Sequence, residues 1–293
     1  MELFIQQVIS GLATGSIYAS LAVALVLIYR STDIVNFAQG EMAMFSAYVA
    51  WALIGAGVPF WPALLITLVG SFIGGLLVER VVIRPVEGRP ELTIVIVTIG
   101  LFIFFNALAG WLWTYQVRGF PSPFPQRTLE LGPVRAGLPA LGIVAVVGIV
   151  VGLLFLLFQR TKLGLTMRAA AENPESSRLV GIRVGWMLAL GWGLAATVGA
   201  VSGVLVAPIL FLSPNMMGAV LIFAFAAATL GGFDSPVGAV VGGLIVGVSE
   251  NLAGTYVDVI GADLKIVIPM AIIVGVLLVK PAGLFGSPAV ERV

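Results

Sequence analysis

The sequence of 293 residues contains neither cysteine nor histidine. The absence of cysteine excludes disulfides and thiolate metal sites. The absence of histidine excludes Ser-His hydrolysis, histidine-ligated metals and histidine proton relays. The pattern G-x-x-x-x-G-K-[ST] is also missing, so the chain does not cradle the phosphates of ATP itself. We therefore expect no catalytic residue, no metal site and no cofactor bound to this chain.

Charged residues are scarce as well, at 10% of the chain, whereas 60% of the residues are hydrophobic. A soluble domain carries about 25% charged residues, because most of its surface faces water. Several uncharged runs reach the roughly 20 residues that a helix needs to cross a bilayer. No basic tract indicates a nucleic-acid partner. The composition predicts an all-α polytopic membrane protein.

Proline, glycine and charge clusters divide the chain into about eight or nine membrane helices. The first apolar run is longer than the core of a signal peptide, so we interpret it as a retained helix. The second segment opens with the polar "NFAQGE" and is predicted to be a broken or re-entrant helix. The predicted segments are 3–29, 36–55, 60–78, 92–113, 140–158, 186–210, 216–232, 237–256 and 263–280.

The distribution of lysine and arginine predicts the orientation. With loop 159–185 in the cytoplasm and nine crossings, 11 of the 15 basic residues lie on the cytoplasmic side, and the C-terminus is cytoplasmic. The N-terminus is external only if segment 36–55 truly crosses. The connection 114–139 is then extracytoplasmic, and its five prolines predict a structured or extended loop. It either docks a partner or simply connects two helices.

The charge is concentrated in residues 163–184, "LGLTMRAAAENPESSRLVGIRV". The first half has high helix propensity. Asn173-Pro174 is expected to interrupt the helix, and a second short helix is expected to end at Gly181. Because the chain has no ATP site, any driving force must come from a partner, and this segment is the candidate docking point. The alternative is a loop that only follows the positive-inside rule.

Two kinds of residue stand out inside the apolar segments. Small-xxx-small glycine pairs, such as Gly70 with Gly74, indicate close helix packing. Polar residues near interrupted segments are candidates for the substrate pathway, because broken helices often line such routes. The alternative at each position is helix capping or hydrogen bonding between helices. The candidates are Asn36, Gln39, Glu41, Ser213, Asn215, Ser249, Glu250 and Asn251.

Six fragments, in this order, resemble a known family. They are "GLATGSIYASLAVALVLIY" at 11–29, "VNFAQGE" at 35–41, "ERVVIRPV" at 79–86, "MRAAAENPESSRLVGI" at 167–182, "LGGFDSPVGAVVGG" at 230–243 and "PAGLFG" at 281–286. The chain resembles the inner-membrane permeases of ATP-binding-cassette (ABC) importers for branched-chain and other hydrophobic amino acids, of the LivH type. Gln39 replaces the histidine of the family's N-F-A-H-G-E pattern, and Asp234 replaces a small residue.

The resemblance implies a type II-like importer bundle with residues 1–293 as one permease domain, in the cytoplasmic membrane of a bacterium or archaeon. It implies a second permease of the LivM type, two ATPase subunits that bind ATP and Mg²⁺, and an extracytoplasmic binding protein. The chain itself is then not an enzyme. Arg168, Glu172, Asn173 and Gly181 fall on the positions of the family's coupling loop.

A competing hypothesis is a self-sufficient channel or facilitator for small polar solutes such as urea or amides. It predicts pore function in the isolated chain and indifference to changes in residues 163–184. An intramembrane enzyme is opposed by the missing histidine and by the lack of paired acidic residues in the middle of the membrane segments.

Overall fold

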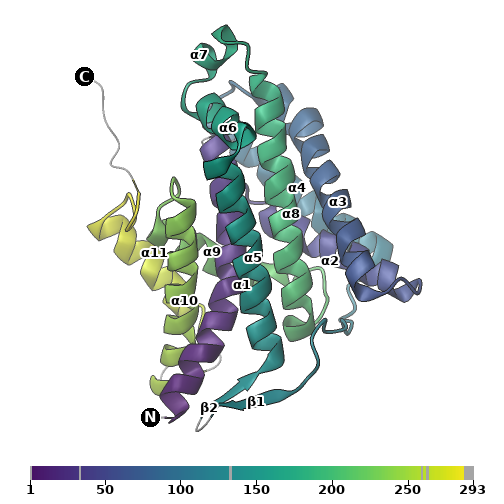
Figure 1. Cartoon of the computed structure of the whole chain (residues 1–293), viewed down its shortest axis with the longest axis vertical. Coiled ribbons are helices and arrows are strands. Elements are labelled where there is room, and N and C mark those ends of the chain that lie inside the picture. Colours follow the sequence, from purple (N-terminus) through teal and green to yellow (C-terminus); the bar gives the residue numbers. More distant parts are fainter. Residues whose placement is uncertain (1, 33, 132–133, 259, 262–263, 287–293) are drawn as a thin grey trace. The chain divides into compact units, whose positions relative to one another are not determined.

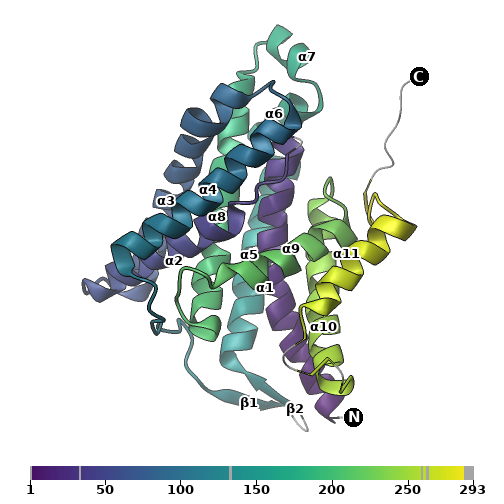
Figure 2. The same cartoon turned by 180° about the vertical axis from the view of Figure 1, so that it is seen from behind.

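The computed structural model describes residues 2–32, 34–131, 134–258, 260–261 and 264–286, and these residues are mostly helical (Figures 1 and 2). The long helices are α1 (Glu2–Thr32), α3 (Phe60–Val78), α4 (Glu91–Trp113), α5 (Leu138–Arg160), α8 (Val184–Leu210) and α10 (Pro236–Tyr256). The shorter ones are α2 (Gln39–Gly55), α6 (Lys162–Glu172), α7 (Pro174–Leu179), α9 (Met217–Gly231) and α11 (Val267–Val279).

The helices confirm the predicted division of the chain. Each of the nine predicted segments coincides with one helix, within a few residues at its ends. By length and composition, six of the described helices can cross a membrane, and α9 and α11 are shorter apolar helices. Helix α2 has only 17 residues and follows a non-helical stretch at residues 34–38, where the sequence predicted a break. The chain is an all-α polytopic membrane protein.

Irregular structure is confined to the connections. Helix α3 continues through a π turn, η1 (Glu79–Ile83), and a 3₁₀ turn, η2 (Arg84–Val86). Pro85 in η2 has no backbone N–H to continue the helix. In the connection 114–139, β1 (Thr128–Leu131) pairs antiparallel with β2 (Val134–Gly137), in the register Thr128 opposite Gly137. This hairpin agrees with the structured loop that the prolines predicted.

The chain divides into two compact units that interleave along the sequence. Unit 1 comprises residues 1–26, 121–148 and 218–293, and unit 2 comprises residues 27–120 and 149–217. In unit 1, the first part of α1 packs on α10 through glycines: a Cβ on Gly15 would come within 2.8 Å of the Gly243 carbonyl oxygen. The stacked rings of Tyr18 and Phe223, 4.7 Å apart, join α1 to α9.

In unit 2, α8 is the buried centre, packed by α2, α3 and α6. The side chain of Trp192 on α8 is completely buried. A Cβ added to Gly75 on α3 would lie 2.5 Å from the Trp192 carbonyl oxygen and 2.9 Å from the Cα of Gly193. The backbones of α3 and α8 therefore approach as closely as two glycines allow.

The prediction that Gly70 and Gly74 on α3 make a close helix contact is wrong. A Cβ on Gly70 or on Gly74 would have no heavy atom of another part of the chain within 4 Å, so these two glycines make no close helix contact within the described residues. The contact is made by Gly75, one position further on. A shift of one residue rotates a helix position by about 100°, which places Gly74 and Gly75 on different faces.

The adjacent glycines provide a matched test of this packing. Gly75→Ala is expected to lower the free energy of unfolding by about 2 kcal/mol, because the methyl group overlaps the backbone of α8. Gly74→Ala adds a methyl group in open space and is expected to be neutral or slightly stabilising. Thermal unfolding of the detergent-solubilised chain measures both changes. Equal stability of the two variants would contradict the assigned α3–α8 contact.

Candidate functional site

Hydrogen bonds of buried polar side chains stabilise the non-helical stretch 34–38 before α2. Asn36 Oδ1 accepts a hydrogen bond from the Ala38 backbone N–H at 3.0 Å, and Asn36 Nδ2 donates to Gln39 Oε1 at 3.3 Å. Gln39 Nε2 in turn donates to the carbonyl of Ala195 on α8 at 3.0 Å. Both side chains are fully buried. Asn36 and Gln39 therefore fix the non-helical segment 34–38 against α8.

Asn106 on α4 forms hydrogen bonds with two of the predicted pathway residues, Glu41 and Asn215. Its Nδ2 donates to Glu41 Oε2 at 3.3 Å, to the Pro214 carbonyl at 3.0 Å and to Asn215 Oδ1 at 3.1 Å. Its Oδ1 accepts from the hydroxyl of Tyr115 at 3.2 Å. An amide nitrogen has two hydrogens, so the three acceptors share them. Residues from α2, α4 and the 213–215 segment thus form one polar cluster within unit 2.

The sequence predicted Glu41 and Asn215 but missed Asn106 and Tyr115. The available signal was the single asparagine of α4, which lies in the uncharged run 92–113 of this 23-residue helix. Glu41 is 1% exposed and makes no ion pair with a described lysine or arginine. A buried carboxylate without a cation is costly in a membrane protein and is a common mark of a functional position. Ser213 does not join this cluster; within the described part of the chain its carbonyl oxygen accepts from the Met216 N–H at 3.1 Å.

Two strained residues lie beside this polar cluster. Thr114, after α4, and Phe211, after α8, have φ angles of 67° and 61°. Such angles cost about 1–3 kcal/mol in residues other than glycine and need compensation nearby. Arg118 and Leu212 provide it by exchanging two backbone hydrogen bonds of 2.9 and 2.8 Å. The Arg118 guanidinium also lies over the ring of Trp51 at 4.7 Å. The ends of α4 and α8 are thereby tied together.

The third predicted polar group belongs to unit 1 and joins α1 to α10. Glu250 Oε2 accepts from the hydroxyl of Tyr18 at 2.7 Å, and Glu250 Oε1 lies 3.9 Å from Lys265 Nζ. Asn251 Nδ2 donates to Thr14 Oγ1 at 3.0 Å. Within unit 1, Glu250 and Asn251 therefore hold two helices together. No hydrogen bond of the Ser249 side chain is found among the described residues. Sequence reasoning did not identify Tyr18 or Thr14 as partners.

The charged segment folds as the sequence predicted, into two short helices separated at Asn173-Pro174. Asn173 ends α6 and begins α7, where its Oδ1 accepts from the Ser176 N–H at 2.9 Å. Gly181 follows α7 with a φ of 85°, a conformation that favours glycine. The Ser177 hydroxyl donates to the Ala169 carbonyl at 2.9 Å and ties α7 back to α6. Asn173 and Gly181 thus shape the segment.

The exposed groups of this segment are its candidate contacts. Helix α6 buries Met167 and Ala170 toward α8 and leaves Glu172 in the open. Arg168 is half-buried. Beyond the predicted residues, Leu179 and Val180 at the end of α7 are 89% and 76% exposed. In both views α7 protrudes past the adjoining ends of α3 and α8 (Figures 1 and 2). Exposed apolar groups rimmed by charged residues are a common feature of protein contact surfaces.

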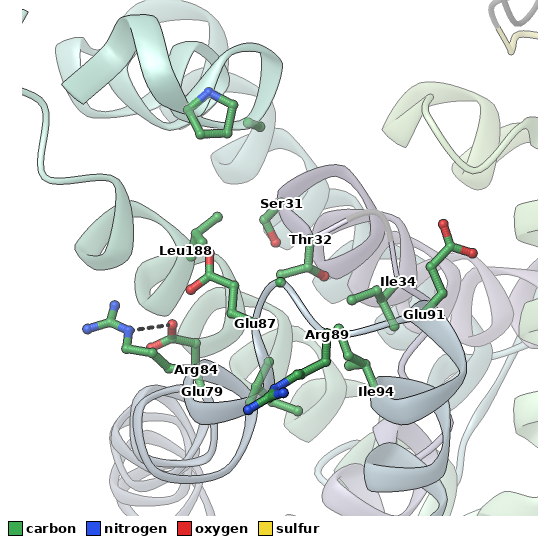
Figure 3. A pocket seen from close by; sticks show the side chains of 14 residues that line it. Ser31, Thr32, Ile34, Glu79, Arg84, Glu87, Arg89, Glu91, Ile94 and Leu188 are labelled. Carbon is green, nitrogen blue, oxygen red and sulfur yellow. Dashed lines mark hydrogen bonds and ion pairs between the residues drawn. The ribbon is translucent and has the colours of Figure 1, made fainter. Parts of the chain in front are cut away.

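A cavity of about 260 Å³ lies behind the charged segment, within unit 2 (Figure 3). Ala171 and Pro174 form part of its wall, together with the end of α1, the turns η1 and η2, and the start of α4. Glu79 and Arg84 from the "ERVVIRPV" motif meet at one side, with Arg84 Nε 3.3 Å from Glu79 Oε1. The family-like motif and the charged segment therefore border the same space.

The polar cluster around Asn106 allows a direct test. Asn106→Ala leaves Glu41, Asn215 and Tyr115 without their shared partner, so we expect the free energy of unfolding to fall by about 2 kcal/mol. Tyr115→Phe removes one bond at the exposed edge and is expected to cost less than about 1 kcal/mol. Denaturant unfolding in detergent measures the two. If Tyr115→Phe costs as much as Asn106→Ala, Asn106 is not the centre of the cluster.

Comparisons with known proteins agree with this arrangement. Residues 7–277 match the family model for the permease component of the branched-chain amino acid transport system. The "High-affinity branched-chain amino acid transport system permease protein LivH" of Salmonella typhimurium is 32% identical, over 99% of this chain and 98% of its own. The protein BraD of Pseudomonas aeruginosa, with the same description, is 31% identical over the same shares.

A solved structure shows the fold independently of these sequences. It is that of "PsaBC from Streptococcus pneumoniae in complex with Fab", with a TM-score of 0.51 and 13% identity over 96% of this chain and 93% of that one. At this identity the likeness concerns the fold alone. The sequence relatives and the family model, by contrast, cover nearly the whole chain. The chain belongs to the family of branched-chain amino acid transport system permease components.

Proposed function

We propose that the chain is the membrane-spanning permease subunit of an ABC importer, and that it forms half of a pathway for branched-chain or other hydrophobic amino acids. The observation that carries this proposal is the similarity, over 99% of the chain, to permease proteins of branched-chain amino acid transport. The two motifs that border the cavity of unit 2, "ERVVIRPV" and the charged segment, belong to that similarity. A permease must also span the bilayer, and six of the described helices are long and apolar enough to do so.

The energy for transport comes from separate ATPase subunits in this proposal. The chain has no phosphate-binding loop of its own. The α6–α7 segment is its docking element: Asn173 and Gly181 set the shape, Glu172 presents a charge, and Leu179 and Val180 present an apolar tip. Two ATPase subunits bind ATP and Mg²⁺, and a homologous second permease of the LivM type completes the pathway. An extracytoplasmic binding protein delivers the amino acid.

The orientation follows from the same assignment. The α6–α7 segment and the C-terminus lie in the cytoplasm, and the connection 114–139 faces the outside of the inner membrane of a bacterium or archaeon. The strained junction of Thr114 and Phe211 is then at the outer ends of α4 and α8. The polar cluster of Glu41, Asn106 and Asn215 is closed by its own hydrogen bonds, so opening a route at this point requires that they separate.

A charge reversal tests the docking element. In the full complex, Glu172→Arg is expected to lower co-purification of the ATPase, and substrate-stimulated ATP turnover, by about tenfold or more, as for a charge reversed at an interface. Glu2→Arg, at the exposed start of α1 in unit 1, is the matched control and is expected to assemble normally. Membrane insertion is measured for both variants.

Two results would contradict the proposal. Normal assembly and turnover of Glu172→Arg would remove Glu172 from the docking contacts. Uptake of substrate by the wild-type chain alone, without ATPase subunits, would show that the chain is a self-sufficient facilitator and not an importer subunit. Reconstitution of the single chain in vesicles, with amino acids and urea as substrates, distinguishes these cases.

A further inference from the structure

The cavity in unit 2 carries unpaired charges of both signs. Glu79 is 2% exposed; its Oε1 accepts from Arg84, and its Oε2 has no hydrogen-bond partner among the described residues. Arg89 and Glu87 also line the cavity; both are exposed, and neither forms an ion pair within the described part of the chain. Figure 3 shows both between the Glu79–Arg84 pair and Ile94. A buried carboxylate oxygen without a donor is costly, and a water molecule or a ligand that donates a hydrogen bond to it removes this cost.

The rest of the wall is mixed: Ser31, Thr32 and Glu91 add polar groups, and four aliphatic side chains form an apolar part. Ile34, Ile83, Ile94 and Leu188 line the cavity, and each is at most 9% exposed. The volume of about 260 Å³ lies just below the range of roughly 300–1,000 Å³ that is usual for drug-sized ligands. The cavity therefore suits a small ligand that has a positive group, a negative group and an aliphatic part.

The charge pattern argues against a metal ion. Within the described residues no group of three or more acidic side chains has the arrangement to hold one. The guanidinium of Arg84 already lies beside Glu79, where it would repel a metal cation. An organic ammonium group is a better match, because it donates directed hydrogen bonds to one carboxylate oxygen and leaves room for a neighbouring guanidinium.

The geometry points to a binding site for a free aliphatic amino acid in this cavity, on the cytoplasmic side and apart from the transport pathway. The ammonium group pairs with Glu79 and Glu87, the carboxylate with Arg89, and the side chain packs on the isoleucines and Leu188. The assignment of the ligand as an amino acid, and of the side as cytoplasmic, rests on the proposed function. The presence of a zwitterion site rests only on the cavity.

The position of the site gives it a regulatory consequence. Ala171 and Pro174, which belong to the α6–α7 docking element, form part of its wall. A ligand that fills the space resists any movement of this element toward the ends of α3 and α4. Binding of the amino acid that has accumulated inside is therefore expected to reduce ATP turnover, which would limit further import.

The test uses the full complex in lipid nanodiscs without the binding protein, and tritiated leucine as the probe. Saturable binding is expected. Arg89→Gln and Glu79→Gln are each expected to weaken it by about tenfold, the loss of one charged hydrogen bond. Arg160→Gln is the matched control: Arg160 is exposed, ends α5 and does not line the cavity. Isoamylamine, which lacks the carboxylate, and isocaproate, which lacks the amine, are expected not to compete.

Several outcomes would overturn the site. These are no saturable binding to the wild type, unchanged affinity in both variants, or competition by either analogue as strong as that by unlabelled leucine. Loss of binding on Glu41→Gln, with Glu79→Gln unaffected, would assign the leucine to the polar cluster of α2 and α4 instead. Uptake driven by the binding protein in vesicles is measured separately: if wild-type uptake is intact and binding is absent, the site fails and the proposed function stands. If uptake is absent as well, the proposed function fails.

Discussion

The hydrogen bonds between buried polar side chains and neighbouring helices are the interactions on which the rest of this structure depends. Inside a bilayer no water is available to satisfy an amide or a carboxylate, so the chain must supply the partner itself. Gln39 donates a hydrogen bond to the Ala195 carbonyl, and Asn106 donates to three acceptors. Glu250 accepts a hydrogen bond from the Tyr18 hydroxyl. Each bond joins elements distant in sequence, so each specifies which elements pack together.

Close packing is the necessary companion of these bonds. A side-chain amide reaches a backbone carbonyl of another helix only if the two backbones are near each other. Glycines make this possible at Gly75 against α8 in unit 2, and at Gly15 against α10 in unit 1. In both places the glycine contacts and the polar contacts involve the same helices or their direct neighbours. Small residues and buried polar residues therefore stabilise the same helix contacts.

The sequence predicted the helices well because their boundaries depend on local features. The Asn173-Pro174 break, the glycine after α7 and the polar stretch before α2 each have a cause within a few residues. Partners were not predictable in this way. Asn106 meets Glu41 across 65 residues, and Tyr18 meets Glu250 across 232, and no local pattern records either pairing. Whether Gly74 or Gly75 contacts α8 likewise depends on how α3 is rotated about its axis. The positions of the glycines in the sequence do not reveal this rotation.

Two places in unit 2 differ in how far their polar groups are satisfied. Around Asn106, carboxylate, amides and hydroxyl share one another's hydrogen bonds, so the cluster is stable until something competes for them. At the charged end of unit 2, in contrast, Glu79 keeps a free oxygen, and Leu179 and Val180 stand exposed. Unsatisfied groups are tolerated where a binding partner can complete them. The fully bonded cluster thus lies among the membrane helices, and the free oxygen of Glu79 lies in the cavity whose wall includes Ala171 and Pro174 of the α6–α7 segment.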